Sequence, residues 1–328
     1  MSRQEVDMAR ILAADIGATN SRFGLFEMES AQDPRLVLSR ELPTAEAVSF
    51  ADMLTRLAGV GLGVRDTSVA GTVLAVAGPV RDGRCQLTNA AWDIDLARRD
   101  GLPEARTVLI NDFVAQALGC LTAHVRSTAT VVQAGVARPG VIAAVGAGTG
   151  LGACALIPHP DVPGRFLPVP TEAGHAPLAF LTAREFAFQE FILRRTGASH
   201  ACGDVVASGR GLGFMHEFLT GKKLSPAEVA AEIGPDSETT AWFARFYGRV
   251  CRMFALHVLP LGGLFVCGGL AAKNPHFVTH PEFLREFTDC PNYADLLAEI
   301  PIRRVTSPAA GLFGAAEYGR TLLDAAHD

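Results

Sequence analysis

Two short apolar runs on either side of a turn dominate the start of the chain. Residues 11–15 are rich in aliphatic side chains, residues 17–20 have the composition of a turn, and residues 22–26 resume the apolar run. Apolar runs of this length around turn-forming residues predict a β-hairpin. Residues 141–145 and 153–157 flank the glycine-rich segment 146–152 in the same way and predict a second hairpin.

The two predicted hairpins are related by a faint internal repeat. When residue 11 is aligned with residue 141, three pairs of identical residues match: Ala13 with Ala143, Ala14 with Ala144, and Thr19 with Thr149. Three identities among small residues carry little weight alone, so the repeat rests on the shared order of strand, phosphate-sized loop and strand. We expect each half of the chain to contribute one loop.

The rest of the chain alternates strands with helices. Strands are predicted at residues 71–77, 107–110 and 264–267, because glycine or polar residues close these apolar runs. Helical periodicity predicts helices over residues 96–100, 113–121, 183–195, 211–219, 226–233, 239–259 and 307–326. This alternation indicates the α/β class.

Composition narrows the classes of function. The chain has 328 residues, 49% hydrophobic and 19% charged, and this length predicts two domains. The net charge of -5 gives no electrostatic reason to bind nucleic acid or an acidic membrane. No apolar stretch reaches the roughly 20 residues of a spanning helix. The seven scattered cysteines, without a C-x-x-C pair, are typical of reduced core thiols in a cytoplasmic protein.

Glycine-rich loops at strand ends indicate phosphate binding, since glycine lets backbone N–H groups approach an anion closely. Neither common nucleotide fingerprint is present. Gly221-Lys222 is followed by Lys223 instead of Ser or Thr, and Leu151 stands where the dinucleotide pattern needs its last glycine. The two hairpin loops therefore remain as the candidate phosphate-binding segments.

The first loop follows an acidic residue, whereas the second loop is neutral. Asp15 can hold Mg²⁺, usually through water, and the alternative is that it only caps its turn. We expect the first loop to bind phosphate oxygens of a nucleotide through Gly17, Ala18, Thr19 and Asn20. We expect the second loop, unless it is a plain tight hairpin, to bind phosphate oxygens through Gly148, Thr149 and Gly150.

Seven motifs, which together span nearly the whole chain, resemble those of bacterial glucokinases. In order they are residues 11–26, Thr88-Asn89 with Trp92, and residues 110–113, 146–152, 172–175, 208–212 and 265–270. The resemblance implies the two-domain fold of the actin-like, hexokinase-like ATPase superfamily, with ribonuclease-H-like sheets and an interdomain cleft. We expect a small α/β domain of residues 1–121 plus 312–328 and a large α/β domain of residues 122–311.

The same resemblance implies roles for individual residues. Asp112 looks like the catalytic base, although a helix cap is the alternative, and Gly268 and Gly269 look like further ATP-binding residues. The implied glucose ligands are Asn89, Asn111, Asp112, Glu172, His175 and Asp204. Asp204 departs from the family pattern, which has glutamate there, so its carboxylate is one methylene shorter. Without the resemblance, Glu172 and His175 are ordinary loop positions.

The implied reaction is transfer of the γ-phosphate of ATP to D-glucose, with Mg²⁺, to give glucose 6-phosphate. Carboxylates, amides and an imidazole suit a hexose, whose hydroxyls both donate and accept hydrogen bonds. Two alternatives stay open: a kinase for mannose, fructose or glucosamine, and an actin-like or chaperone-like ATPase that acts without sugar. No structural zinc is expected. The sequence leaves the oligomeric state open, with a homodimer as one option.

Overall fold

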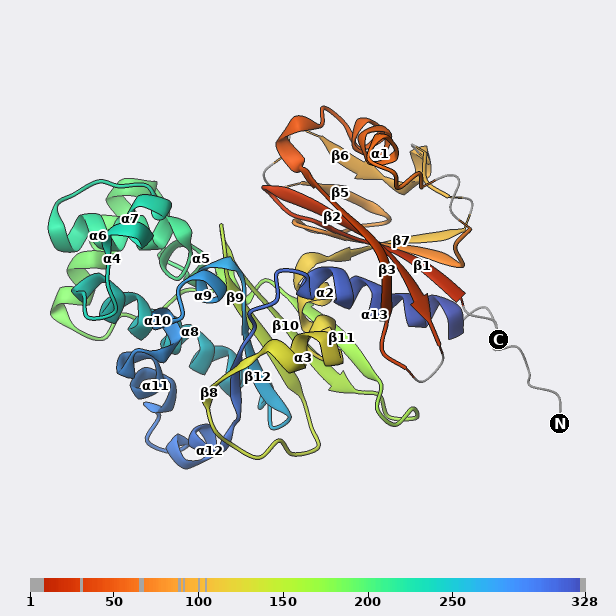
Figure 1. Ribbon diagram of the computed structural model, residues 1–328. Coiled ribbons are helices and arrows are strands. Elements are labelled where there is room, and N and C mark those ends of the chain that lie inside the picture. Colours follow the sequence, from red (N-terminus) through yellow and green to blue (C-terminus); the bar gives the residue numbers. More distant parts are fainter. Residues whose placement is uncertain are drawn as a thin grey trace. The chain divides into compact units, whose positions relative to one another are not determined.

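The chain forms two compact units, each described here by itself. The computed structural model describes residues 9–29, 32–64, 68–87, 90, 92–99, 101–103 and 105–324. Unit 1 comprises Met1–Ser127 and Ala309–Asp328, and unit 2 comprises Thr128–Pro308. The last helix, α13 (Ala310–Asp324), thus belongs with the first strands (Figure 1). Domain boundaries at 121/122 and 311/312 stay a prediction.

A five-stranded sheet forms the centre of the described part of unit 1. Its order is β3-β2-β1-β4-β7, with β1, β4 and β7 parallel and β2 antiparallel to both of its neighbours. The strands are β1 (Ala9–Ile16), β2 (Asn20–Met28), β3 (Arg35–Pro43), β4 (Gly71–Val76) and β7 (Arg106–Asn111). A separate pair consists of β5 (Arg84–Gln86) and β6 (Asp93–Asp95).

Helices cover both faces of this sheet, which explains why β4 is buried along its whole length. On one face, Phe50 and Met53 of α1 pack with Leu12 and Leu74. On the other, α13 packs against β1, β4 and α2. The helical elements of unit 1 are η1 (Thr44–Glu46), α1 (Phe50–Gly59), η2 (Leu96–Arg98), α2 (Asp112–Gly119), α3 (Ala123–Thr128) and α13.

The predicted short helix over residues 96–100 is a 3₁₀ helix of residues Leu96–Arg98. Regular backbone ends at Arg98, because Arg99 adopts a left-handed conformation with φ of +60°. Such a residue cannot continue a right-handed helix. The prediction of a short helix is confirmed at this position, and the helix ends at Arg98.

A six-stranded sheet of order β11-β10-β9-β12-β13-β8 forms the centre of unit 2 within the described residues. Strand β9 pairs with β10 antiparallel and with β12 parallel, as β1 does with β2 and β4. Both predicted hairpins therefore exist and have the same topology. The strands are β8 (Thr130–Gln133), β9 (Ile142–Ala147), β10 (Leu151–Pro158), β11 (Phe166–Thr171), β12 (Gly263–Cys267) and β13 (Ile302–Arg304).

The edge strand β11 contains two prolines. Pro168 pairs with Leu156 of β10, and Pro170 pairs with Cys154. The pairing of β10 with β11 continues across both positions.

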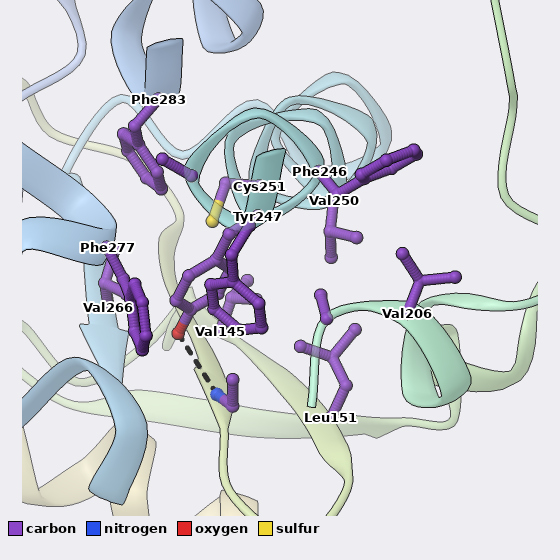
Figure 2. Packing of buried hydrophobic residues seen from close by; sticks show 14 of the residues in the cluster. Val145, Leu151, Val206, Phe246, Tyr247, Val250, Cys251, Val266, Phe277 and Phe283 are labelled. Atoms are coloured by element: carbon purple, nitrogen blue, oxygen red, sulfur yellow. Dashed lines mark hydrogen bonds between the residues drawn. The ribbon is translucent and has the colours of Figure 1, made fainter. Parts of the chain in front are cut away.

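The long helix α8 (Glu238–Val258) supplies much of the core of unit 2. Its Tyr247, Val250 and Cys251 point toward strand residues that include Val145, whereas Phe246 points away from them (Figure 2). The other helical elements are η3 (Ala173–His175), α4 (Ala183–Thr196), α5 (Gly203–Val206), α6 (Gly209–Thr220), α7 (Pro226–Glu232), α9 (Gly269–Lys273), α10 (His276–Thr279), α11 (Pro281–Thr288) and α12 (Ala294–Glu299).

All seven cysteines are free thiols; six are buried and Cys290 is partly exposed. Within the described ranges, no helix combines the length and the apolar character needed to cross a membrane.

Candidate active site

The carboxyl ends of three parallel strands lie side by side in unit 1. The register pairs Ile16 of β1 with Val76 of β4, and Val76 with Asn111 of β7. The β1–β2 turn therefore starts at the same edge of the sheet as helix α2. This brings Asp15 and its turn to the same edge as Asn111 and Asp112. Ligands of open α/β sheets bind outside the carboxyl ends of the strands.

Asp15 is a buried carboxylate in a row of charged side chains. In the register of the sheet, Asp15 lies opposite Arg22 of β2, and Arg22 lies opposite Glu41 of β3. Arg22 donates to Glu41 from Nε to Oε2 at 3.0 Å and from Nη2 to Oε1 at 3.1 Å. Asp15 is 8% exposed, and burial raises the pKa of its carboxyl to about 6, while Arg22 lowers that pKa and Glu41 raises it. Burial disfavours the ionised carboxylate, so a bound cation would stabilise it.

The backbone at the start of α13 closes over the Asp15 carboxylate. A Cβ built on Gly311 would lie 2.5 Å from Asp15 Oδ2 and 2.9 Å from Gln116 Nε2. Any larger residue at position 311 would therefore displace the carboxylate. No local pattern in the sequence connects Gly311 with Asp15.

The β1–β2 turn is closed by backbone and side-chain hydrogen bonds. The Gly17 N–H donates to the Asn20 carbonyl at 3.1 Å. Thr44 of η1 donates its N–H to the Thr19 carbonyl at 2.9 Å and its hydroxyl to the Gly17 carbonyl at 2.8 Å. The predicted ATP-binding residues Gly17, Ala18, Thr19 and Asn20 therefore occupy a turn whose carbonyls are fixed.

Asn111 caps helix α2, and Asp112 is the first residue of that helix. Asn111 Oδ1 accepts from the Phe113 N–H at 2.9 Å, and its Nδ2 donates to the Gly78 carbonyl at 3.4 Å. Asp112 Oδ1 accepts from the same Phe113 N–H at 2.9 Å. Burial first and the Asp112 charge second raise the pKa of the Cys85 thiol to about 11. The helix dipole favours a carboxylate at the Asp112 position.

In unit 2, the β9–β10 loop is held from its own turn and from helix α6. The Gly148 N–H donates to the Gly150 carbonyl at 2.8 Å, and the Gly209 N–H donates to the Gly148 carbonyl at 2.8 Å. A Cβ built on Gly148 would meet no atom within 4 Å, and Thr149 is exposed. This loop has the open backbone that phosphate binding requires.

Tyr247 connects the β9–β10 loop with the segment that precedes Gly268 and Gly269 in unit 2. The Ala147 N–H donates to the Tyr247 hydroxyl at 3.1 Å, drawn as a dashed line in Figure 2. That hydroxyl donates to the Cys267 carbonyl at 3.3 Å. Burial raises the pKa of Tyr247 well above its usual range, so the hydroxyl keeps its proton. Gly268 and Gly269 follow Cys267 directly, so Tyr247 ties their strand to the start of the β9–β10 loop.

Asp204, a predicted sugar ligand, contacts the β9–β10 loop. Its Oδ1 accepts from the Leu151 N–H at 2.9 Å, and its Oδ2 accepts from Arg210 Nη2 at 3.4 Å. A Cβ built on Gly150 would collide with the Asp204 carboxylate. The Asp204 side chain, one methylene shorter than glutamate, therefore holds the end of the β9–β10 loop. The role of Asp204 as a sugar ligand stays a prediction.

Glu172 precedes the short helix η3, and His175 is its last residue. Their side chains are 70% and 63% exposed, with 3.8 Å between His175 Nε2 and Glu172 Oε2. Between them, Gly174 lies so close to the Leu151 carbonyl that a Cβ would collide with it. Unit 2 thus brings Glu172, His175 and Asp204 to the same part of the β9–β10 hairpin. Asn89 lies outside the described residues.

A cavity of about 320 Å³ lies inside unit 2, behind η3. Ala173 and Gly174 of η3 line it together with Val250, Met253 and Phe254 of α8. The lining is mostly apolar, so it suits neither a sugar nor a phosphate.

Comparisons with known proteins identify the family. The glucokinase family model matches residues 12–322. A glucokinase of Rhizobium meliloti is 32% identical, with 96% of this chain and 93% of that protein covered. A glucokinase of Sinorhizobium fredii is 31% identical over the same shares.

Solved structures agree with this fold. The crystal structure of a glucokinase from an Antarctic psychrotroph matches with a TM-score of 0.79 and 25% identity, covering 95% of this chain and 99% of that one. A ROK-family glucokinase from Streptomyces griseus, solved with glucose and AMPPNP, matches with a TM-score of 0.63 and 19% identity, covering 95% of this chain and 100% of that one. From the family model and the identity over nearly its full length, the chain belongs to the glucokinase family.

Proposed function

We propose that the protein transfers the γ-phosphate of ATP to the 6-hydroxyl of D-glucose. Family membership supports this reaction. The observation that carries it is the register that sets Asp15 and Asp112 at the ends of strands in one sheet, separated by β4. Two strand spacings amount to roughly 10 Å, which leaves room for a phosphoryl group and a sugar hydroxyl between a nucleotide-binding turn and an acceptor-binding carboxylate.

Mg²⁺ fits the residues at the β1–β2 turn. Asp15 is a buried carboxylate whose pKa is raised to about 6 by burial, so a cation would favour its ionised form. Among the described residues no group of three or more His, Cys, Asp or Glu side chains is arranged to hold a metal ion. Mg²⁺ in kinases needs only one or two carboxylates, because phosphates and water complete its coordination. When bound, it would neutralise phosphate charge.

Asp112 is the proposed acceptor of the sugar proton. Phosphoryl transfer passes through a loose transition state, so positioning and charge stabilisation supply most of the rate. An aspartate is too weak a base to ionise an alcohol beforehand, so Asp112 orients the 6-hydroxyl and takes its proton late. The N–H of Phe113 and the start of α2 hold this carboxylate in place.

The remaining predicted residues are proposed to bind the substrates. The turn at residues 17–20, the loop at residues 148–150 and Gly268-Gly269 receive ATP. Glucose is held by Asn111, Glu172 and His175, with Asn89 and Asp204 as further candidates. The exposed pair Glu172 and His175 supports this assignment, since both side chains can turn toward a ligand.

A coupled assay for ADP, with and without each common hexose, tests the proposal. We expect glucose to stimulate ADP release from Mg-ATP more than mannose, fructose or glucosamine, with one glucose 6-phosphate formed per ADP. A larger response to another hexose would reject glucose but keep the kinase. Equal ADP release without any sugar would favour the actin-like ATPase alternative.

Location and assembly are separate proposals. The scattered free thiols support a cytoplasmic enzyme, where glucose phosphorylation would begin glycolysis. A homodimer remains one option, which size-exclusion chromatography with light scattering would decide.

A further inference from the structure

Thr44 makes three hydrogen bonds around the β1–β2 turn. Its N–H donates to the Thr19 carbonyl at 2.9 Å, and its hydroxyl donates to the Gly17 carbonyl at 2.8 Å. The same hydroxyl lies 2.9 Å from the Ser21 hydroxyl. Thr44 is 1% exposed and Ser21 is fully buried, so water does not replace these partners.

The direction of these bonds follows from the number of protons. A threonine hydroxyl has one proton, and here the Gly17 carbonyl, which can only accept, takes it. The Ser21 hydroxyl must therefore donate to Thr44 Oγ1. Ser21 thus fixes the Thr44 hydroxyl in the orientation that reaches Gly17.

Fixing two carbonyls also fixes two amide groups of the turn. In a planar trans peptide the C=O and the following N–H point in opposite directions. Because the Gly17 and Thr19 carbonyls point toward Thr44, the N–H groups of Ala18 and Asn20 point away from it. Backbone N–H groups presented in this way are the groups that bind phosphate oxygens.

We propose that Thr44 is a positioning residue that holds the β1–β2 turn in its phosphate-binding conformation. The inference rests on the proposed function, because it assumes that the turn binds ATP. Thr44 does not touch the nucleotide. It acts through the peptide groups of residues 17–20, on the opposite side of the turn from the phosphates.

Thr44→Val tests this role, because valine keeps the shape and the backbone N–H but removes the hydroxyl. The Gly17 carbonyl and the Ser21 hydroxyl would then lack their buried partner. We expect the Kd for Mg-AMPPNP, measured by calorimetry, and the KM for ATP to rise about tenfold. The KM for glucose should stay within about twofold. Thr44→Ser should restore the affinity to within about threefold of the wild type.

Thr72→Val is the matched control. Thr72 is fully buried in β4 of the same sheet, and its hydroxyl has no hydrogen-bond partner among the described residues. The same exchange there should leave AMPPNP affinity unchanged. If Thr44→Val does not fold, Ser21→Ala decides, with an expected threefold rise in Kd and an unchanged KM for glucose.

The results separate this inference from the proposed function. Wild-type protein without sugar-dependent ADP formation would reject the function, whatever Thr44 does. Active wild type with unchanged AMPPNP affinity in Thr44→Val would overturn the inference alone. Equal losses in Thr44→Val, Thr44→Ser and Thr72→Val would also overturn it, since they would indicate a general effect on unit 1.

Discussion

Replacing Asp15 by asparagine should remove a pH-dependent cost from the fold. Burial raises the pKa of the Asp15 carboxyl from 3.8 to about 6. Between these two values the unfolded chain has an ionised Asp15 and the folded chain a protonated one. The unfolded state then binds fewer protons, so stability falls as pH rises from about 4 to 6 and is lowest above the folded pKa. Asparagine does not ionise and should lack this dependence.

The expected magnitude follows from the two pKa values. At about 1.4 kcal/mol per pH unit, the gap between 3.8 and about 6 corresponds to about 3 kcal/mol. Asp15→Asn should therefore gain about 3 kcal/mol over the wild type between pH 4 and pH 7.5. At neutral pH the variant should be more stable without ligand and use Mg-ATP poorly, while glucose binding persists.

The two tryptophans make the assay specific for unit 1. Trp92 lies in unit 1 and Trp242 in unit 2, and the chain has no other tryptophan. In a Trp242→Phe background, Trp92 fluorescence during urea unfolding reports on unit 1 alone. Without this background, the unfolding of the two units would overlap in the signal. Asp52→Asn is the control. The Val48 N–H first and Arg56 second lower the pKa of Asp52. The ionised Asp52 therefore stabilises the fold as pH rises, so the stability difference between Asp52→Asn and the wild type should change with pH in the opposite direction to that of Asp15→Asn.

A flat difference between Asp15→Asn and the wild type from pH 4 to pH 7.5 would refute the reasoning. It would mean that Arg22 offsets the cost of burying the charge. Loss of binary glucose binding in a folded Asp15→Asn protein would refute the separate role in Mg-ATP use.

Three further variants test other parts of the structure. Asp112→Asn should fold and lose about 10² to 10⁴ in kcat, with little change in ATP affinity; more than a tenth of kcat remaining would show that Asp112 is not the base. Tyr247→Phe should raise the KM for ATP and destabilise unit 2 by about 1–3 kcal/mol in urea unfolding, because the Ala147 N–H loses a buried partner. Arg249→Met should cost about 3–5 kcal/mol in the same assay, because Arg249 is 1% exposed and pairs with Glu185 and Glu286; a loss below 1 kcal/mol would contradict this.

In the two large sheets, the hydrophobic pattern predicted strands β1, β2, β4, β7, β9, β10 and β12 but missed β3, β8, β11 and β13. The hairpin strands β1, β2, β9 and β10 were identified because their apolar runs are buried on both faces. Strand β3 was missed, since its solvent-exposed edge position leaves every residue at least partly exposed. Strand β11 was missed for a similar reason and because two prolines interrupt its pattern.

Glycines and carboxylates of the candidate site were visible in the sequence, whereas the residues that hold them were not. Thr44 reaches Gly17 across 27 residues, and Tyr247 reaches Ala147 across 100. Nothing local distinguishes such a threonine or tyrosine from an ordinary core residue. The Asp204 contact with Leu151 depends likewise on how α5 packs against the loop.

The edge strand β11 bears on how the protein behaves at high concentration. Proline has no N–H to donate, so within a paired strand it is tolerated where its nitrogen faces away from the neighbouring strand. Pro168 and Pro170 are two residues apart and therefore face the same outer edge. A strand from another molecule would find pyrrolidine rings where it needs donors. The exposed apolar side chains of Leu167 and Val169 are thereby kept from starting a sheet that grows from one molecule to the next.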